Sequence, residues 1–226
     1  GAFTNTTGDV SYVGTAYTFD TRSGVGESAF FIWGDNGSGN LGQNLPEASD
    51  RSSPVQIPGT TWRSVNWGGN GQQNFATKTD GTFWAWGYNY FGELGLNDTT
   101  YRSSPTQVGT DTTWSKNHSV GGYRSALATK TNGTLWVWGD NNFGAFGKPG
   151  TNPNSKISSP VQIPGTSWDH SNWGKLAARQ MGGGAIRTDN TLWVWGYNNN
   201  SCLGLNTPDN GHRSSPTQIP GTDWNR

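Results

Sequence analysis

Short β-prone runs separated by glycine-rich polar turns recur along the whole chain. In the clearest case, runs at residues 75–79 and 82–87 flank Asp80-Gly81. An Asp-Gly or Asn-Gly pair between two such runs is the strongest local sign of a β-hairpin, because both central residues of a type I′ turn need positive φ. The pattern therefore predicts hairpins, and no segment has the 3.6-residue apolar periodicity of an amphipathic helix.

The predicted strands are apolar on both faces. In residues 135–138, the two-residue period of a strand places Leu135 and Val137 on one face and Trp136 and Trp138 on the other. A strand without a polar face is packed on both sides. We therefore expect small sheets stacked against one another rather than one sheet with a solvated face.

One unit of this pattern occurs four times, at steps of about 52 to 57 residues, and a fixed period is typical of an array of equivalent units. Trp-Gly-x-Asn begins at Trp33, Trp86, Trp138 and Trp195, Ser-Pro follows at Ser53, Ser104, Ser159 and Ser215, and the closing residues are Trp62, Trp114, Trp168 and Trp224. The units divide a single domain, residues 1–226, into repeats at approximately 1–62, 63–114, 115–168 and 169–226. With about four strands in each unit, they predict an all-β fold that is a β-propeller or part of one.

Two further strand-like runs, at residues 10–13 and 17–19, precede the first full repeat. Four repeats leave two blade faces that must be covered, because an open edge strand and an apolar face invite association. Either the fourth blade packs on the first, with residues 9–20 joining the closing sheet, or other chains cover those faces. We expect the amino-terminal runs to join the first blade.

Composition and charge exclude several classes of protein. Hydrophobic residues make up only 31% of the chain, but it has 13 Trp, 9 Phe and 7 Tyr, so its apolar area is concentrated in large rings. The formal net charge is zero, with 15 basic and 15 acidic residues and no basic stripe. We therefore expect no nucleic-acid partner, and no apolar run is long enough for membrane insertion.

The sequence contains no motif of catalysis, metal binding or cofactor binding. The single cysteine, Cys202, excludes an internal disulfide framework and a cysteine-rich metal site. The three histidines do not have the spacing of zinc ligands, and the glycine runs at 68–71 and 182–184 lack the lysine and the helix of a P-loop. We therefore expect a protein that is not an enzyme and has no cofactor.

The repeat resembles that of the RCC1 (regulator of chromosome condensation) family. Repeat 2 shows the family pattern throughout, with Asp80-Gly81, Trp86-Gly87, Gly92-Glu93-Leu94-Gly95 and Pro105. The resemblance covers roughly residues 12–224 and implies a β-propeller, in this family a ring of about seven blades. Four repeats would then form a small ring, an arc completed by another copy, or part of a longer protein. In its Trp-Ala-Trp-Gly-Tyr-Asn segment and its Asn/Thr/Gly-rich loops, the chain is also similar to phage-encoded and environmental RCC1-like proteins.

Residues present in only one repeat are better candidates for function than residues that recur. Tyr101 and Tyr123 have no aromatic counterpart in the other repeats, and Lys175 and Arg179 lie in a segment unique to repeat 4. We predict that these four residues contact a partner. The Trp-Gly tryptophans and the arginines before Ser-Ser-Pro recur, so we interpret them as structural.

Three functional hypotheses follow. The first is a non-catalytic interaction or structural propeller, displayed on a larger assembly such as a virion or on an extracellular surface, that binds a protein partner or other copies of the same chain. The second is a lectin-like propeller that binds glycan through its aromatic residues. The third, implied by the resemblance, is a regulator similar to the family's exchange factor for a small GTPase.

Overall fold

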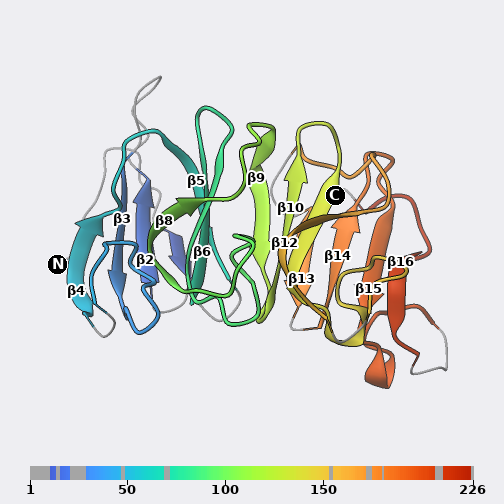
Figure 1. Ribbon diagram of the computed structural model, residues 1–226. Helices are drawn as coiled ribbons and strands as arrows, with labels where there is room; N and C mark the ends of the chain where they lie inside the picture. Colours follow the sequence, from blue (N-terminus) through green and yellow to red (C-terminus); the bar gives the residue numbers. More distant parts are fainter. Residues whose placement is uncertain are drawn as a thin grey trace.

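The computed structural model describes residues 11–13, 16–20, 29–46, 49–68, 72–152, 155–171, 175–179, 181–206 and 211–224. These residues form four antiparallel sheets of four strands each, which Figure 1 shows side by side as blades. Only two single-turn 3₁₀ segments are helical within these ranges, η1 (Asn142–Gly144) and η2 (Asn199–Ser201). The prediction of an all-β fold with four strands per repeat is confirmed.

Each blade uses four strands in chain order, so the connections inside a blade are hairpins and loops. Blade 1 consists of β1 (Ser11–Val13), β2 (Ala16–Asp20), β3 (Phe30–Gly34) and β4 (Arg51–Gln56), and blade 2 of β5 (Trp62–Trp67), β6 (Gln73–Lys78), β7 (Phe83–Gly87) and β8 (Arg102–Gln107). Blade 3 consists of β9 (Trp114–Gly121), β10 (Ser125–Lys130), β11 (Leu135–Asp140) and β12 (Lys156–Ile163), and blade 4 of β13 (Leu176–Arg179), β14 (Gly182–Ile186), β15 (Leu192–Gly196) and β16 (Arg213–Gln218).

The hairpin at Asp80-Gly81 forms where the sequence predicts it, but with a different turn. Gly81 has φ of 82° whereas Asp80 does not have positive φ, so the type I′ expectation is wrong. Gly81 N donates to Lys78 O at 3.0 Å, and Asp80 Oδ1 accepts hydrogen bonds from both the backbone N and the Oγ1 of Thr82. The loop thus has three residues, and its aspartate satisfies local donors instead of adopting a left-handed conformation.

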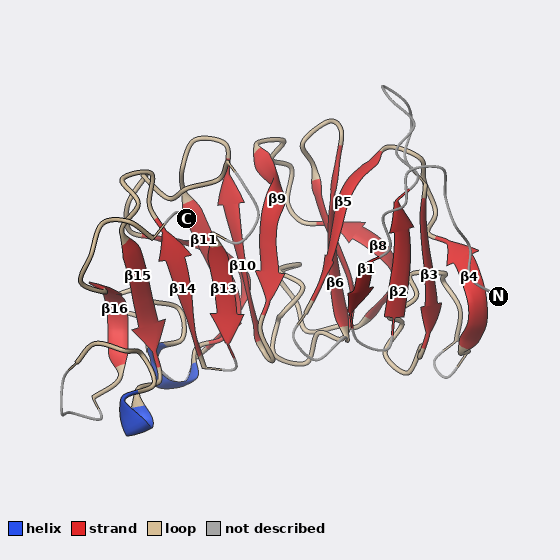
Figure 2. Ribbon diagram, turned by 180° about the vertical axis from the view of Figure 1, so that it is seen from behind, coloured by secondary structure: helices blue, strands red, loops and turns tan. Residues whose placement is uncertain are grey.

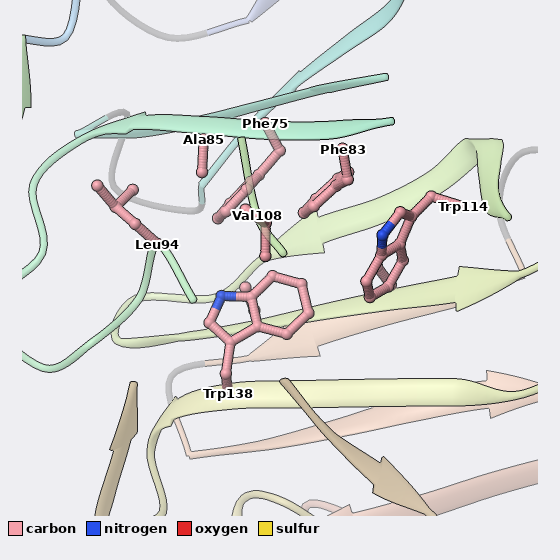
Figure 3. Packing of buried hydrophobic residues seen from close by; sticks show 9 residues of the cluster. Phe75, Phe83, Ala85, Leu94, Val108, Trp114 and Trp138 are labelled. Atoms are coloured by element: carbon pink, nitrogen blue, oxygen red, sulfur yellow. The ribbon is translucent and has the colours of Figure 1, made fainter. Parts of the chain in front are cut away.

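The hydrophobic cores lie between blades. Figure 3 shows the middle one, in which Trp138 of blade 3 points toward Phe75 and Phe83 of blade 2, with ring centroids 6.1 and 5.8 Å apart. Equivalent clusters join blade 1 to blade 2 and blade 3 to blade 4. Each blade is therefore packed on a face of its neighbour, as strands apolar on both sides require.

The tryptophans of Trp-Gly fix adjacent blades to each other by hydrogen bonds as well. The indole Nε1 of Trp86, Trp138 and Trp195 donates to a backbone carbonyl of the preceding blade, on Asn40, Glu93 and Ala145 respectively. These three tryptophans are fully buried, as predicted, whereas Trp33 of blade 1 is half-buried.

The blades form an open arc. Blades 1 and 4 lie at opposite ends of the row in both views, and β9 contacts β5 on one side and β13 on the other (Figures 1 and 2). Blade 4 therefore does not pack on blade 1 within the described residues. The amino-terminal runs join the first blade as β1 and β2, which confirms that expectation, although Val10 lies outside the described residues.

Candidate functional site

The loops between the third and fourth strands of the blades lie along one edge of the arc, where Figure 2 shows η1 and η2. An asparagine after each Trp-Gly holds its loop. Asn89 Oδ1 accepts a hydrogen bond from Leu94 N at 2.9 Å, and Asn89 Nδ2 donates to the carbonyl oxygens of Asp98 and Thr100. Equivalent backbone donors bind Asn36, Asn141 and Asn198. The loops are thus anchored and present their side chains in defined positions.

The loop of blade 2 carries a cluster of aromatic rings. The ring centroid of Tyr88 lies 4.8 Å from that of Tyr101 and 6.5 Å from that of Tyr90, and the rings of Tyr90 and Phe91 meet edge to face at 4.9 Å. Burial, with a hydrogen bond to Tyr101, raises the pKa of Tyr88 to about 12. The hydroxyl of Tyr88 is therefore harder to ionise than an ordinary tyrosine hydroxyl.

Two cationic groups of blade 3 lie against these rings. The guanidinium of Arg124 is 4.3 Å from the centroid of Phe91 and 5.3 Å from that of Tyr123. Lys156 Nζ is 4.3 Å from the centroid of Tyr90. Cations at such distances are attracted by the negative face of an aromatic ring. We call this surface the aromatic–cationic patch, and it comprises Tyr88, Tyr90, Phe91, Tyr101, Tyr123, Arg124 and Lys156.

A second group of rings continues along the same edge between blades 3 and 4. The ring centroid of Phe143, in η1, lies 5.1 Å from that of Tyr197 and 4.8 Å from that of His212. The rings of Tyr197 and His212 stack on each other. His212 is held in place because its Nδ1 accepts a hydrogen bond from Asn198 N at 3.2 Å. A hollow of about 480 Å³ beside Phe143 and Tyr197 also contains Met181 in its lining. The edge therefore combines exposed rings with a hollow that they border.

A buried acid lies beneath the patch. Glu93 is fully buried, and its Oε2 accepts a hydrogen bond from Phe91 N at 2.7 Å. Its other carboxyl oxygen has no hydrogen-bond partner among the described residues. Desolvation raises the pKa of Glu93 to about 7, with a smaller contribution from the charge of Asp140. The carboxyl group beneath the patch therefore changes its protonation state near pH 7.

Two of the four residues predicted to contact a partner belong to the patch. Tyr101 is half-buried against Tyr88, and Tyr123 is exposed. Lys175 is buried instead, with its Nζ 4.0 Å from Asp169 Oδ2, and lies at the opposite end of β13 from the patch edge. Arg179 ends β13, and its side chain lies outside the described part of the chain.

Sequence reasoning missed Arg124 and Lys156, the two cations of the patch, and named Lys175 and Arg179 instead. Arg124 directly follows Tyr123, and Lys156 starts β12 at a position that other repeats give to Tyr101 and His212. The residue type at these positions differs from one repeat to the next. That variation is the sequence signal that could have marked them as candidate functional positions. Their contact with the rings depends on how blades 2 and 3 pack, and the sequence alone does not contain that distance.

The described ranges contain no group of three or more His, Cys, Asp or Glu side chains placed to hold a metal ion. No described helix is long and apolar enough to cross a membrane.

Sequence comparison identifies the repeat. The model of the regulator of chromosome condensation (RCC1) repeat matches residues 80–127 and 189–225. The ultraviolet-B receptor UVR8 of Arabidopsis thaliana is 28% identical over 194 residues, which are 83% of this chain and 41% of the receptor. A probable E3 ubiquitin-protein ligase of Homo sapiens, HERC3, is 30% identical over 143 residues, 62% of this chain and 13% of the ligase. The chain thus spans less than half the length of these relatives.

Structural comparison agrees. Yeast RCC1 (Prp20), solved in complex with Kap60, superposes with a TM-score of 0.70 at 18% identity, over 94% of this chain and 51% of Prp20. Human WBSCR16 superposes with a TM-score of 0.68 at 19% identity, over 91% of this chain and 52% of the human protein. At these identities the likeness shows the fold alone, and the fold is that of half a propeller. The chain thus contains RCC1 repeats at residues 80–127 and 189–225, and its blade architecture is similar to that of RCC1 propellers.

Proposed function

We propose that the chain is a non-catalytic interaction propeller that binds a protein partner through the aromatic–cationic patch and the adjoining Phe143 group. One observation carries this proposal. The most exposed large aromatic side chains of blades 2 and 3, Tyr90, Tyr123 and Phe143, are 54%, 44% and 38% exposed and gather on one edge. Clustered apolar exposure marks an interaction site, whereas single exposed rings are ordinary.

The composition of the patch fits a protein partner. Tyrosine and arginine are enriched at the energetic centres of protein interfaces, because they combine a large contact area with a polar group. Arg124 and Lys156 are held over rings, so ordering them on binding costs less side-chain entropy. A partner segment with apolar side chains and a carboxylate would match both features.

The named structures are consistent with this proposal. Prp20 was solved in complex with Kap60, and another study of Prp20 reports its binding properties to Gsp1p and histones. These partners belong to Prp20, and a regulator similar to an exchange factor stays a second alternative for this chain. Display on a virion or an extracellular surface stays a prediction, and none of the relatives named above is a virion protein.

A lectin-like function is the main competitor, because exposed rings such as Tyr90 and Tyr123 also suit the apolar faces of sugars. The experiment screens the purified chain against a displayed library of random linear peptides and, in parallel, against a glycan array. We expect enriched peptides with apolar and acidic residues. Enrichment on the glycan array alone would overturn the protein-binding proposal in favour of the lectin.

The double variant Tyr90→Ala/Tyr123→Ala connects binding to the patch. We expect it to weaken binding of a selected peptide by at least about tenfold, the usual loss at an interface hot spot, without changing the melting temperature. Trp224→Ala is the matched control, because this tryptophan is similarly exposed but lies outside the patch. Equal binding by the wild type and the double variant would contradict the assignment. Acceleration of nucleotide release from a small GTPase would support the exchange-factor alternative instead.

A further inference from the structure

The linker that leads into the closing tryptophan differs in repeat 2. The other three repeats have Ile-Pro-Gly-Thr-x-Trp there, at residues 57–62, 163–168 and 219–224. Repeat 2 has Val-Gly-Thr-Asp-Thr-Thr-Trp at residues 108–114, which lacks the proline and is one residue longer. Because features of a single repeat are better candidates for function than recurring ones, this linker is a candidate for a role that its counterparts do not have.

At the junctions of blades 1 and 2 and of blades 3 and 4, the glycine of the Pro-Gly pair lies against the closing tryptophan. Pro58 O accepts a hydrogen bond from the indole Nε1 of Trp62 at 3.2 Å. A Cβ added to Gly59 would lie 3.2 Å from that nitrogen, and a Cβ added to Gly165 would lie 3.3 Å from Nε1 of Trp168. The linker itself therefore fills the space beside the indole at these two junctions.

At the junction of blades 2 and 3, the same space is open. A Cβ added to Gly109 would meet no atom within 4 Å. A hollow of about 370 Å³ opens there, and its lining includes Gly109, Trp114, Trp136 and Pro160. We call this hollow the linker pocket. Its volume lies in the roughly 300–1,000 Å³ range of ligand sites, and none of its lining residues belongs to the aromatic–cationic patch.

A buried hydrogen-bond donor without an acceptor adjoins this pocket. Trp114, at one end of the cluster in Figure 3, is 4% exposed, and its indole Nε1 has no hydrogen-bond partner among the described residues. A buried donor without an acceptor destabilises the fold, and a ligand that supplies the acceptor recovers that cost. Trp168 Nε1 also lacks an acceptor, but its linker covers it, whereas at Trp114 the missing acceptor coincides with open space.

An ion pair anchors the longer linker. Asp111 Oδ2 accepts a hydrogen bond from Lys130 Nζ at 2.6 Å, and Asp111 Oδ1 accepts hydrogen bonds from the backbone N and the Oγ1 of Thr113. Lys130 Nζ lies 4.0 Å from the ring centroid of Trp136 and 4.7 Å from that of Trp114. The two charged side chains of the pocket are thus paired with each other, which leaves the N–H of Trp114 for an uncharged acceptor such as a peptide carbonyl.

The chain has four Pro-Gly-Thr segments and four closing tryptophans. Three of the segments precede a closing tryptophan, and a Cβ added to Gly59, Gly165 or Gly221 would lie 3.1 to 3.3 Å from the indole nitrogen. The fourth segment, at residues 149–151, forms a turn of blade 3 in which Pro149 and Gly150 are exposed. A Cβ added to Gly150 would meet no atom within 4 Å. One segment without a tryptophan therefore corresponds to one tryptophan without a segment.

We infer that the linker pocket binds the Pro149-Gly150 turn of a second copy of this chain. Gly150 has positive φ, as Gly59 does, so the turn already has the backbone form that the internal pairs use. Its proline carbonyl accepts the N–H of Trp114, as Pro58 O accepts that of Trp62. The aromatic lining of the pocket also suits a rigid proline ring.

The contact joins two copies, because the turn and the pocket of one chain lie at different junctions. The turn begins two residues after Gly147, which packs on Trp195 of blade 4, whereas the pocket lies between blades 2 and 3. Each copy offers one turn and one pocket, so the contact is heterologous. Successive copies therefore form a closed ring or an open row.

The indole N–H signal of Trp114 in an NMR spectrum reports this contact. Between about 20 μM and about 1 mM protein, the signal should move as a contact with a Kd of about 200 μM becomes occupied. The signal of Trp62 is the internal control and should not move, because its N–H is already bonded to Pro58 O. A Trp114 signal that stays unchanged over this range would overturn the inference.

Two variants separate the turn from the pocket. Pro149→Ala/Gly150→Ala removes the turn, and replacement of residues 109–113 by Pro-Gly-Thr-Thr, the sequence of residues 58–61, fills the pocket from the same chain. Each variant alone should associate at least about tenfold more weakly than the wild type. Thr112→Ala is the matched control and should associate as the wild type does, because this exposed linker residue does not line the pocket.

A mixture of the two variants gives the decisive measurement, because one keeps the pocket and the other keeps the turn. Light scattering should show a pair with twice the 24.4 kDa of one chain, and the Trp114 signal of the labelled turn variant should move. Melting temperatures check that both variants are folded. A mixture that stays monomeric, or association that both variants retain separately, would contradict the inference. The peptide Lys-Pro-Gly-Thr, residues 148–151, should move the wild-type Trp114 signal without any variant.

Discussion

At the scale of single residues, Glu93 holds two neighbouring parts of the fold and has a buried carboxyl group that can titrate. Its backbone carbonyl accepts the indole N–H of Trp138, and its carboxyl group accepts a hydrogen bond from Phe91 N beneath the patch. A buried carboxylate with an unsatisfied oxygen is costly, and protonation removes that cost. The residue therefore favours the neutral acid inside the fold and the carboxylate in the unfolded chain.

The consequence is a stability that falls as the pH rises. The pKa of Glu93 is about 7 in the folded protein against an ordinary value of 4.5, so the folded state binds the proton more tightly. The contribution of this proton is complete below pH 4.5 and is lost as the pH rises to about 7. Glu93→Gln keeps an acceptor for Phe91 N and removes the charge. We expect it to raise the free energy of unfolding at pH 8 by up to roughly 3 kcal/mol, and to change little near pH 4. Urea unfolding at both pH values measures this, and an equal effect at the two pH values would contradict it.

At the scale of strands and blades, the third strands of blades 2, 3 and 4 each contain two tryptophans with different tasks. In β11, Trp138 is fully buried between blades 2 and 3, whereas Trp136 is half-buried and donates its Nε1 hydrogen to Thr134 Oγ1 at 2.8 Å. Lys130 Nζ lies 4.0 Å from the centroid of Trp136, so this ring carries a cation on its outer side. Trp136 and Trp138 lie on the same face of β11, so their positions along the strand separate the fully buried ring from the partly exposed one.

Trp138→Ala should therefore destabilise the protein by about 3 to 5 kcal/mol, as truncation of a large buried aromatic side chain does. Trp136→Ala is the matched control in the same strand, and its cost should be clearly smaller because the ring is already partly hydrated. Chemical unfolding of the two variants gives the comparison. A loss below about 1 kcal/mol for Trp138→Ala would mean that the blade interface does not depend on this ring.

The strands follow from local sequence, but the patch does not. Asp80-Gly81 determines where a hairpin turns, and the spacing of residues such as Trp138 determines which face of a strand is buried. Both depend on residues close in the sequence, so the repeats and the buried positions can be predicted from it. The turn type at Asp80 was missed because its carboxylate competes for Thr82. The partners of Phe91 come from another blade, about 33 residues further on at Arg124, and depend on packing between blades.

At the scale of the whole molecule, the amino-terminal segment decides how the arc begins. β1 and β2 complete blade 1, and without them β3 would be an uncovered edge strand beside an apolar face.

Deletion of residues 1–20 should lower the melting temperature by at least about 5 °C and change the state of association, because one blade loses half its strands. Deletion of residues 1–9 is the control, since it removes no described strand. Scanning calorimetry with light scattering provides both readouts. If the longer deletion leaves melting and mass unchanged, the amino-terminal strands do not close the first blade.

Because the hydrophobic cores lie between blades, each sheet shares the apolar contacts that stabilise it with a neighbouring sheet. Such a chain behaves as a one-dimensional row of coupled units. Each blade alone has little stability, and most of the stabilising free energy comes from the contacts between neighbouring blades. A defect at a middle junction weakens two neighbours at once, whereas a change at an end weakens one. Loop residues that contact no neighbouring blade can vary in number without changing a junction, so this architecture lets surfaces diverge while the junctions stay constant.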